Sequence, residues 1–175
     1  KENCNIEINN KKINFNYFYK FKQRGKYTIK YKFKKNITKT DFMFYDCKSL
    51  TNIDLSNFNT QNIINMESIF NGCETLTKIN LYNFKTENVT NMAYMFYGCK
   101  LLEDINISNF NTQNVVNMKK MFYECKSLTN IDLFNFNTQN VTDMEWMFSG
   151  CESLINIDLS NFNTQNVTNM EGIFY

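Results

Sequence analysis

Cysteine is the residue type whose spacing in this 175-residue chain is most suggestive of chemistry. The chain has six cysteines, and five of them lie at a constant interval of 26 residues, namely Cys47, Cys73, Cys99, Cys125 and Cys151. Zinc and redox sites use much closer pairs of cysteines, usually within a few residues of each other. The spacing therefore indicates a repeated structural position rather than a metal or redox site.

The chain contains no histidine, which excludes several kinds of catalytic site. Ser-His-Asp and Cys-His nucleophiles need an imidazole base, and many zinc sites need histidine ligands. No nucleophile with its base, metal-ligand cluster or phosphate-binding loop can be assembled from the residues that remain. We therefore expect a protein that is not an enzyme and that has no catalytic residue, cofactor or metal.

The cysteine interval belongs to a repeat of 26 residues that fills most of the chain. With each of these cysteines counted as position 1, Leu occupies position 4, Ile position 7, Leu or Ile position 9, and Phe positions 12 and 24 in all five copies. Isoleucine or valine occupies position 17, and methionine position 20. Asn36, Ile37, Met43 and Phe44 already match positions 16, 17, 23 and 24. Residues 36–175 thus form a half-repeat and five repeats.

The apolar period changes within each copy, which predicts a short strand followed by a short helix. In the fourth copy, Ile131 and Leu133 alternate with Asp132, as in a strand that shows one face to a core. An apolar stripe at helical spacing follows, made of Val141, Met144, Met147, Phe148 and Cys151. Glycines stand where such a helix would end in a left-handed residue, at Gly72, Gly98 and Gly150.

A unit this small cannot bury its apolar faces alone, so the copies must stack on one another. Stacking gives each strand a parallel neighbour about 4.8 Å away and joins the apolar positions into continuous columns. The sequence therefore predicts an α/β repeat solenoid of short parallel strands and short helices over residues 36–175.

Asparagine is invariant at positions 11 and 16 of the five copies. Its amide both donates and accepts hydrogen bonds, which predicts ladders that satisfy backbone groups at the corners of the stack. Three of the five N-x-S/T sequons fall in the position-16 ladder, where we expect a buried amide closed to glycosylation. The sequons are Asn36, Asn88, Asn106, Asn140 and Asn166.

Stacking also brings equivalent cysteines to neighbouring levels, with Cα atoms about 5 Å apart. That distance permits disulfides, but a free thiol on an apolar column packs as a small hydrophobe. We favour a ladder of buried thiols and keep disulfides as the alternative. Cys4 lies outside this ladder.

Residues 1–35 are predicted to form a basic antiparallel β-cap on the first level of the stack. Residues 13–22 and 27–34 alternate apolar and polar side chains around a turn at 23–26, and Ile6 and Ile8 suggest an earlier strand joined at Asn9 and Asn10. Residues 1–39 hold twelve lysines and arginines against two acidic residues, a net charge of +10, whereas residues 40–175 carry a net charge of −8. Lysines on strands also discourage edge pairing.

The basic segment has two further interpretations. A nucleic-acid surface is the weaker one, because Arg24 is the only arginine and no RNA-binding motif is present, so we expect no nucleic-acid partner. A cationic face for acidic glycans or anionic lipid headgroups is the other. No run of eighteen apolar residues occurs, so we expect no transmembrane segment.

The repeat resembles that of the BspA-like leucine-rich-repeat surface proteins. Within residues 125–151 the matching residues are Leu128, Ile131, Leu133, Asn135 to Thr138, Asn140, Val141, Met144, Met147, Phe148 and Cys151. The resemblance covers residues 36–175 and implies a leucine-rich-repeat-like stack in a secreted or cell-surface interaction protein, often an adhesin, with no catalytic residues.

Positions that vary between copies are expected to face outward and to determine specificity. These are position 8, position 10 and position 22, and the aromatic residues among them are expected to bind partners: Tyr82, Tyr94, Phe134 and Trp146. We expect an extracellular adhesion or interaction module for protein or glycan ligands. The alternative is a filament subunit that stacks head to tail, a basic cap against an apolar rung left open at Phe174 and Tyr175.

Overall fold

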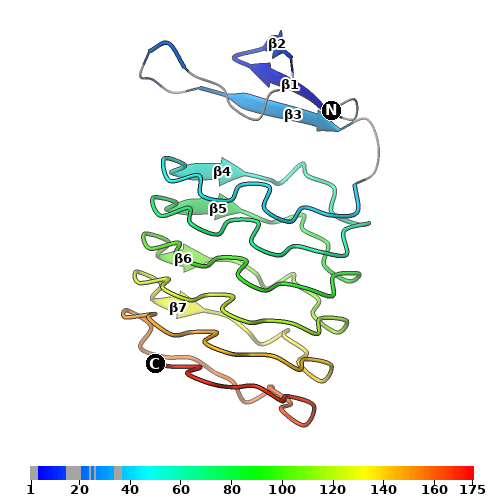
Figure 1. The fold of residues 1–175 in the computed structure, drawn as a ribbon, viewed down its shortest axis with the longest axis vertical. Helices are drawn as coiled ribbons and strands as arrows, with labels where there is room; N and C mark the ends of the chain where they lie inside the picture. Colours follow the sequence, from blue (N-terminus) through cyan, green and yellow to red (C-terminus); the bar gives the residue numbers. More distant parts are fainter. Residues whose placement is uncertain (1–3, 15–20, 24, 26, 34–36) are drawn as a thin grey trace. The chain divides into compact units, whose positions relative to one another are not determined.

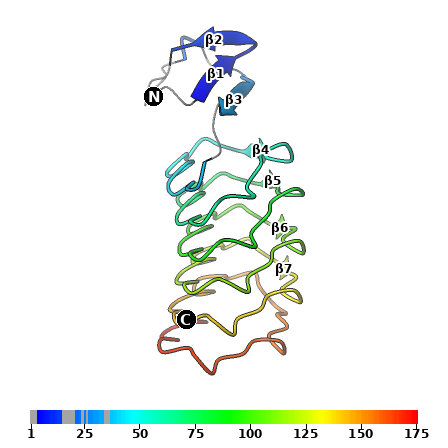
Figure 2. The ribbon, with the colours of Figure 1, turned by 90° about the vertical axis from the view of Figure 1, so that its right-hand side faces the viewer.

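The computed structural model describes residues 4–14, 21–23, 25, 27–33 and 37–175. The chain divides into two compact units, Lys1–Ile37 and Thr38–Tyr175. Figures 1 and 2 show a small sheet in the first unit and a series of stacked turns of chain in the second. Each turn in the second unit corresponds to one 26-residue repeat and is called a coil below.

The first unit contains a three-stranded antiparallel sheet with the order β2-β1-β3. Its strands are β1 (Cys4–Ile8), β2 (Lys11–Ile13) and β3 (Ile29–Phe33). The early strand is confirmed, and Asn9 and Asn10 join it to β2 with left-handed φ angles of 49° and 63°, as a tight hairpin requires. β3 pairs with β1 on one edge, and across the turn predicted at 23–26 the rings of Phe21 and Tyr27 lie 4.1 Å apart, so the expected pairing of 13–22 with 27–34 stays a prediction. Residues 15–20 lie outside the described part.

The short parallel strands expected of the repeats are confirmed. In the second unit, β4 (Asn52–Asp54) pairs with β5 (Lys78–Asn80), and β6 (Asp104–Ile105) pairs with β7 (Asn130–Ile131). The register is one repeat, so that Ile53 lies opposite Ile79 and Ile105 opposite Ile131. Parallel bridges at position 19 connect every successive coil, through Lys39, Asn65, Asn91, Asn117, Asp143 and Asn169.

The predicted helices are wrong: the described residues contain no helix. In the segment after position 19, alternate N–H groups donate to the following coil instead of to their own turn. Met66 donates to Asn91 O at 3.0 Å, and Phe70 to Met95 O at 3.0 Å. The N–H groups that alternate with them close four-residue turns, such as Asn71 to Ser68 O at 3.2 Å. The neighbouring coil supplies the acceptors that a helix would find within itself.

Two left-handed positions per coil also prevent a helix. Position 26 has positive φ, and the three glycines predicted to be left-handed are so, at φ 76°, 67° and 71° for Gly72, Gly98 and Gly150. Position 22 has positive φ as well, yet it carries large side chains such as Tyr94 and Trp146. Left-handed residues interrupt the right-handed helical path, so the apolar stripe folds as successive turns.

Columns of identical apolar side chains form the core of the second unit. The rings of Phe70, Phe96, Phe122 and Phe148 stack at centroid distances of 5.5, 5.5 and 5.6 Å and are almost completely buried. Leucine at position 4 and methionine at position 20 are fully buried beside them in the middle coils. The repeated apolar positions of the sequence are therefore the positions that face the core.

Candidate functional site

Threonine at position 14 forms a buried polar column. In the middle of the stack, the hydroxyl of Thr112 donates to the carbonyl of Asn137 at 2.9 Å and accepts from the Asn137 N–H at 2.8 Å. The same pair of bonds recurs at Thr60, Thr86 and Thr138. This column was not predicted, although the threonine in all five copies was a signal for it. Its side chains hold successive coils together and are inaccessible to a ligand.

The asparagine ladders are confirmed. Nδ2 of Asn114 at position 16 donates to Glu87 O in the preceding coil at 2.7 Å, and Nδ2 of Asn109 at position 11 donates to Tyr82 O at 3.1 Å. The expected burial at position 16 is wrong, because the sequon residues Asn88, Asn140 and Asn166 are exposed. Their amides lie at a corner of the coil and bond to backbone that is itself near solvent.

Position 8 faces outward as expected, and its side chains also shape the backbone. Asp132 Oδ1 accepts the N–H of Phe134 at 2.9 Å, which closes an Asx-turn. The same turn occurs in the other copies, at Asp54, Asn80, Asn106 and Asp158. Both aspartate and asparagine occur at this position because each provides the acceptor oxygen that the turn needs.

All six cysteines are free thiols in the structure. The thiol of Cys125 donates to Phe96 O at 3.1 Å, and that of Cys99 to Phe70 O at 3.3 Å. Burial raises the pKa of Cys73 to about 12 and holds the pKa values of Cys99 and Cys125 well above the usual range. The buried members of the ladder are therefore neutral packing residues, with no thiolate for nucleophilic or metal chemistry.

Alkylation of the folded chain by iodoacetamide at pH 8 is expected to modify the exposed Cys47 and to spare Cys99 and Cys125. Peptide mass spectrometry after timed quenching would measure each rate. In guanidinium chloride, all six cysteines should react. Modification of Cys99 as fast as Cys47 under native conditions would contradict the burial of the thiol ladder.

Two of the four expected partner-binding residues are isolated on the surface. Tyr82 and Phe134 occupy position 10 and have 77% and 73% of their surface exposed. They belong to copies two repeats apart, and the intervening copy carries Ser108 at this position. They are accessible, but they do not form a continuous surface.

The other two residues, Tyr94 and Trp146, lie in a row of rings that crosses several coils. Tyr94 lies 5.9 Å from Tyr97, Tyr97 stacks on Tyr123 at 4.8 Å, and Tyr123 lies 6.3 Å from Trp146, all as centroid distances. We call these four residues the aromatic strip. All four are half-buried. Tyr97 and Tyr123 were not predicted, although aromatic residues recur at position 25 in the sequence.

Two lysines share one carboxylate beside the aromatic strip, and a second carboxylate, Glu124, lies near Tyr97 and raises its pKa after the larger effect of burial. Lys120 Nζ lies 5.5 Å from the ring centroid of Tyr123 and 5.8 Å from that of Trp146, in cation–π geometry. It is also 4.0 Å from Glu145 Oε1, while Lys119 bonds to Glu145 Oε2 at 2.8 Å. The hydrogen bond from Lys119 lowers the pKa of Glu145, so the carboxylate stays ionised at neutral pH.

Lysines gather on one face of the sheet in the first unit. The β-sheet register places Lys12 and Lys30 opposite Glu7. Lys32 bonds to the Glu7 carboxylate at 2.6 Å, and this bond lowers the pKa of Glu7. The described residues therefore include an exposed basic face with one neutralised acid.

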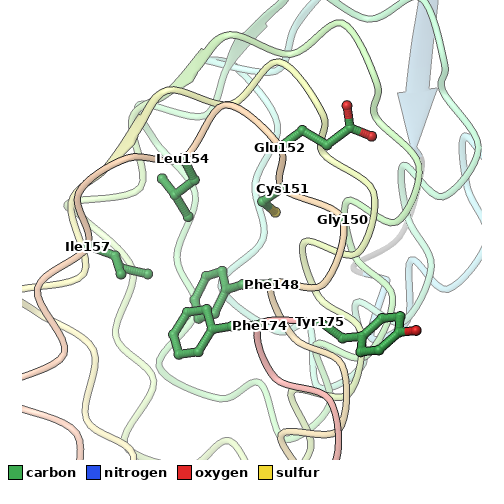
Figure 3. A pocket seen from close by; sticks show the side chains of 8 residues that line it. All are labelled: Phe148, Gly150, Cys151, Glu152, Leu154, Ile157, Phe174 and Tyr175. Atoms are coloured by element: carbon green, nitrogen blue, oxygen red, sulfur yellow. The ribbon is translucent and has the colours of Figure 1, made fainter.

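A cavity of about 290 Å³ opens at the last coil (Figure 3). Phe148 of the fourth repeat lines it together with Cys151, Leu154 and Phe174 of the fifth. In preceding coils, the side chains at positions 24, 1 and 4 are buried beneath the coil that follows. The cavity thus belongs to the surface on which coils pack, and its lining is mainly apolar, with Glu152 as its one charged residue.

No cluster of three metal-ligating side chains occurs among the described residues. The same part of the chain has no helix of the length and apolarity needed to cross a membrane. What distinguishes the accessible surface is the aromatic strip, the single rings at position 10 and the basic face of the first unit.

The fold and surface define a repeat protein in which 26-residue coils pair with their neighbours. The family model described as "Mycoplasma protein of unknown function, DUF285" matches residues 13–105 and 101–175, and the chain belongs to this family. No curated protein and no solved structure matches this chain. The expected membership of a repeat family is thereby supported.

Proposed function

We propose that the protein is a non-enzymatic interaction module of the cell surface or extracellular space, built as a leucine-rich-repeat-like solenoid. The repeat family and the resemblance to BspA-like surface proteins support this role. The interlocked threonine and asparagine columns support a rigid scaffold, since each coil is bonded to the next at several corners. Rigid scaffolds lose little conformational entropy when they bind.

The observation that carries the proposal is the set of accessible aromatic side chains on this scaffold. Tyr82 and Phe134 project into solvent. The four rings of the aromatic strip are half-buried, so part of each is also accessible. Tyrosine and tryptophan dominate the energetics of protein interfaces. Many weak contacts along a repeated surface would add up to useful avidity.

A binding assay tests this function. The purified chain, presented to immobilised extracellular matrix proteins and to a glycan array, should bind at least one of them. The triple variant Tyr82→Ala, Phe134→Ala, Trp146→Ala should lower the affinity at least tenfold, because it removes the accessible rings. Ser56→Ala, at position 10 of another copy, is the matched control. Absence of binding to every extracellular probe would refute the proposal.

A second candidate is a self-assembling extracellular filament. The charge division favours it, because a basic first unit could meet the acidic coils of another copy. The apolar surface of the last coil would be covered by a further coil or by another molecule. Size-exclusion chromatography at low and high salt would distinguish the two functions. Polymers that dissociate with salt would support assembly, and a monomer at high concentration would exclude it.

A further inference from the structure

Acidic and aromatic side chains share the outward side of the strand segments in the later coils. Ile105 and Ile107 are buried, so the residues that alternate with them, at positions 6, 8 and 10, face outward. In the third to fifth copies, four exposed residues at these positions form what we call the acidic strand face: Asp104, Asp132, Phe134 and Asp158. The face extends over three successive coils.

The carboxylates of the acidic strand face have no lysine partner in the part of the chain that the structure describes. Glu152, in contrast, is paired with Lys126 of the preceding coil at 2.6 Å. The ring of Phe134 is 73% exposed, and the face of an aromatic ring attracts cations as a carboxylate does. Uncompensated negative charge and an accessible ring together favour a cationic partner.

The first unit carries a surface of the opposite charge, the basic face, formed by Lys12, Lys30 and Lys32. Lys12 and Lys30 lie opposite Glu7 on its two neighbouring strands, and Lys32 follows Lys30 by two residues on β3. All three lysines therefore point to one side of the sheet, and all three are exposed. Lys32 is bonded to Glu7 at 2.6 Å, which leaves Lys12 and Lys30 as the uncompensated charges.

The charges of the two faces have matching spacings, because both faces are built on neighbouring extended segments. Lys12 and Lys30 lie two strands apart, which places their backbones about 10 Å from each other. Asp104 and Asp158 lie two coils apart, a separation of about 10 Å along the stack. The flexible side chain of lysine lets each ammonium group reach a carboxylate or the Phe134 ring without a change in either backbone.

We propose that the basic face of one molecule docks on the acidic strand face of a second copy of this chain, an inference that rests on the self-assembly named above as the second candidate function. The two faces are different surfaces, so a docked pair still presents one free face of each kind and further copies can add. Exposed ion pairs are individually weak and are screened by salt. We therefore expect association that grows with protein concentration and falls as salt is added.

The repeat itself supplies substitutions that remove charge and preserve the backbone. Asp132 Oδ1 accepts the N–H of Phe134, and Asn80 and Asn106 make the same turn at position 8 of other copies. Asparagine also occupies position 6 in three of the other copies. Asparagine can therefore replace the three aspartates of the acidic strand face with a residue that this fold already accepts. These substitutions make up the aspartate variant: Asp104→Asn, Asp132→Asn and Asp158→Asn.

A second variant, the lysine variant, neutralises the basic face. Lys12→Gln and Lys30→Gln remove its two uncompensated charges and leave the pair of Lys32 with Glu7 intact. Both variants should melt no lower than the parent chain, since all the substituted side chains are exposed. Asn106→Asp tests the opposite change, because it keeps the turn and adds a carboxylate to the acidic strand face. This variant should associate severalfold more strongly than the parent chain.

Sedimentation velocity over a concentration series at low salt measures the association. The parent chain should form dimers and larger assemblies that high salt dissociates, and each variant alone should associate at least tenfold more weakly. An equimolar mixture of the aspartate and lysine variants should form a complex of one molecule of each and nothing larger. The aspartate variant retains only the basic face and the lysine variant only the acidic strand face, so the two can pair but cannot extend.

Three results would overturn the proposal, and they differ in what they leave standing. Association that both variants retain would keep self-assembly and exclude these two faces. Variants that are each monomeric and do not pair when mixed would show that the faces do not meet between molecules. A parent chain that stays monomeric at low salt but captures polylysine, and loses it in the aspartate variant, would exclude self-assembly and assign the acidic strand face to another cationic protein.

Discussion

Replacement of Phe122 by alanine is expected to lower the free energy of unfolding of the coils by about 3–5 kcal/mol. The Phe122 ring is fully buried and stacks between Phe96 at 5.5 Å and Phe148 at 5.6 Å. Its loss opens a cavity within a column that the polar bonds of both flanking coils prevent from collapsing. Urea denaturation followed by Trp146 fluorescence would measure the change.

Phe134→Ala is the control for this experiment. It removes the same side chain from a position that is 73% exposed, and we expect a change within about 0.5 kcal/mol. If Phe122→Ala destabilised the protein by no more than the control, the aromatic column would not be the core of the stack.

The second large effect is expected from Thr112→Val, with a loss of about 2–3 kcal/mol. Valine has almost the shape of threonine, so packing is preserved. The substitution leaves both the carbonyl and the N–H of Asn137 without their hydroxyl partner in a partly buried site. Deletion of one partner exposes the full desolvation penalty of the backbone groups that remain. Thermal and urea unfolding would each record the loss.

Thr90→Val provides a matched comparison in the same scaffold. The Thr90 hydroxyl donates to Ile64 O at 3.2 Å, but the backbone N–H of Thr90 donates to the same carbonyl at 3.0 Å. The carbonyl therefore keeps a partner, and we expect a loss below about 0.5 kcal/mol. A similar loss in the two variants would mean that the position-14 column has no special role.

These interactions are what make the surface a fixed array. Threonine at position 14 and asparagine at positions 11 and 16 lock each coil to its neighbour, so the spacing of outward side chains is set by the spacing of coils. The aromatic strip inherits that spacing.

Much of the core could be predicted from the sequence because identical residues must occupy equivalent places in a stack. The 26-residue period identified the leucine, phenylalanine and methionine columns, and the structure buries them. The asparagine ladders followed from invariant polar positions and amide chemistry. The exposure of Asn88 and its equivalents could not be predicted, since hydrogen bonding and burial are separate properties.

The prediction of helices was wrong because the spacing of apolar residues does not determine where the backbone N–H groups find their hydrogen-bond partners. An apolar spacing of three, three, one and three residues places side chains on one face of a helix, but it does the same for successive turns. The choice depends on whether N–H groups bond within the segment or to a neighbouring coil. Ser68 and Phe70 donate to Ala93 and Met95, and a single copy of the repeat contains no such acceptor.

The candidate site, too, could be predicted only in part from the sequence. Sequence variation among copies was enough to select Tyr82, Tyr94, Phe134 and Trp146 as outward residues. Only the tertiary structure showed that Tyr94 and Trp146 join Tyr97 and Tyr123 in one row while the other two stay apart. The contacts between coils in this row join Tyr97 to Tyr123 and Tyr123 to Trp146, and they exist only because stacking brings successive copies together.

The sequence by itself determined the period, the core columns and the absence of histidine chemistry, because these depend on residue type and spacing alone. The tertiary structure decided the backbone path of each coil, the left-handed conformation of position 22 and the continuity of the aromatic strip. These properties arise from hydrogen bonds and contacts between residues 25 to 29 apart in the chain, as in the bonds of Thr112 and Cys125. Their geometry exists only once the coils are stacked.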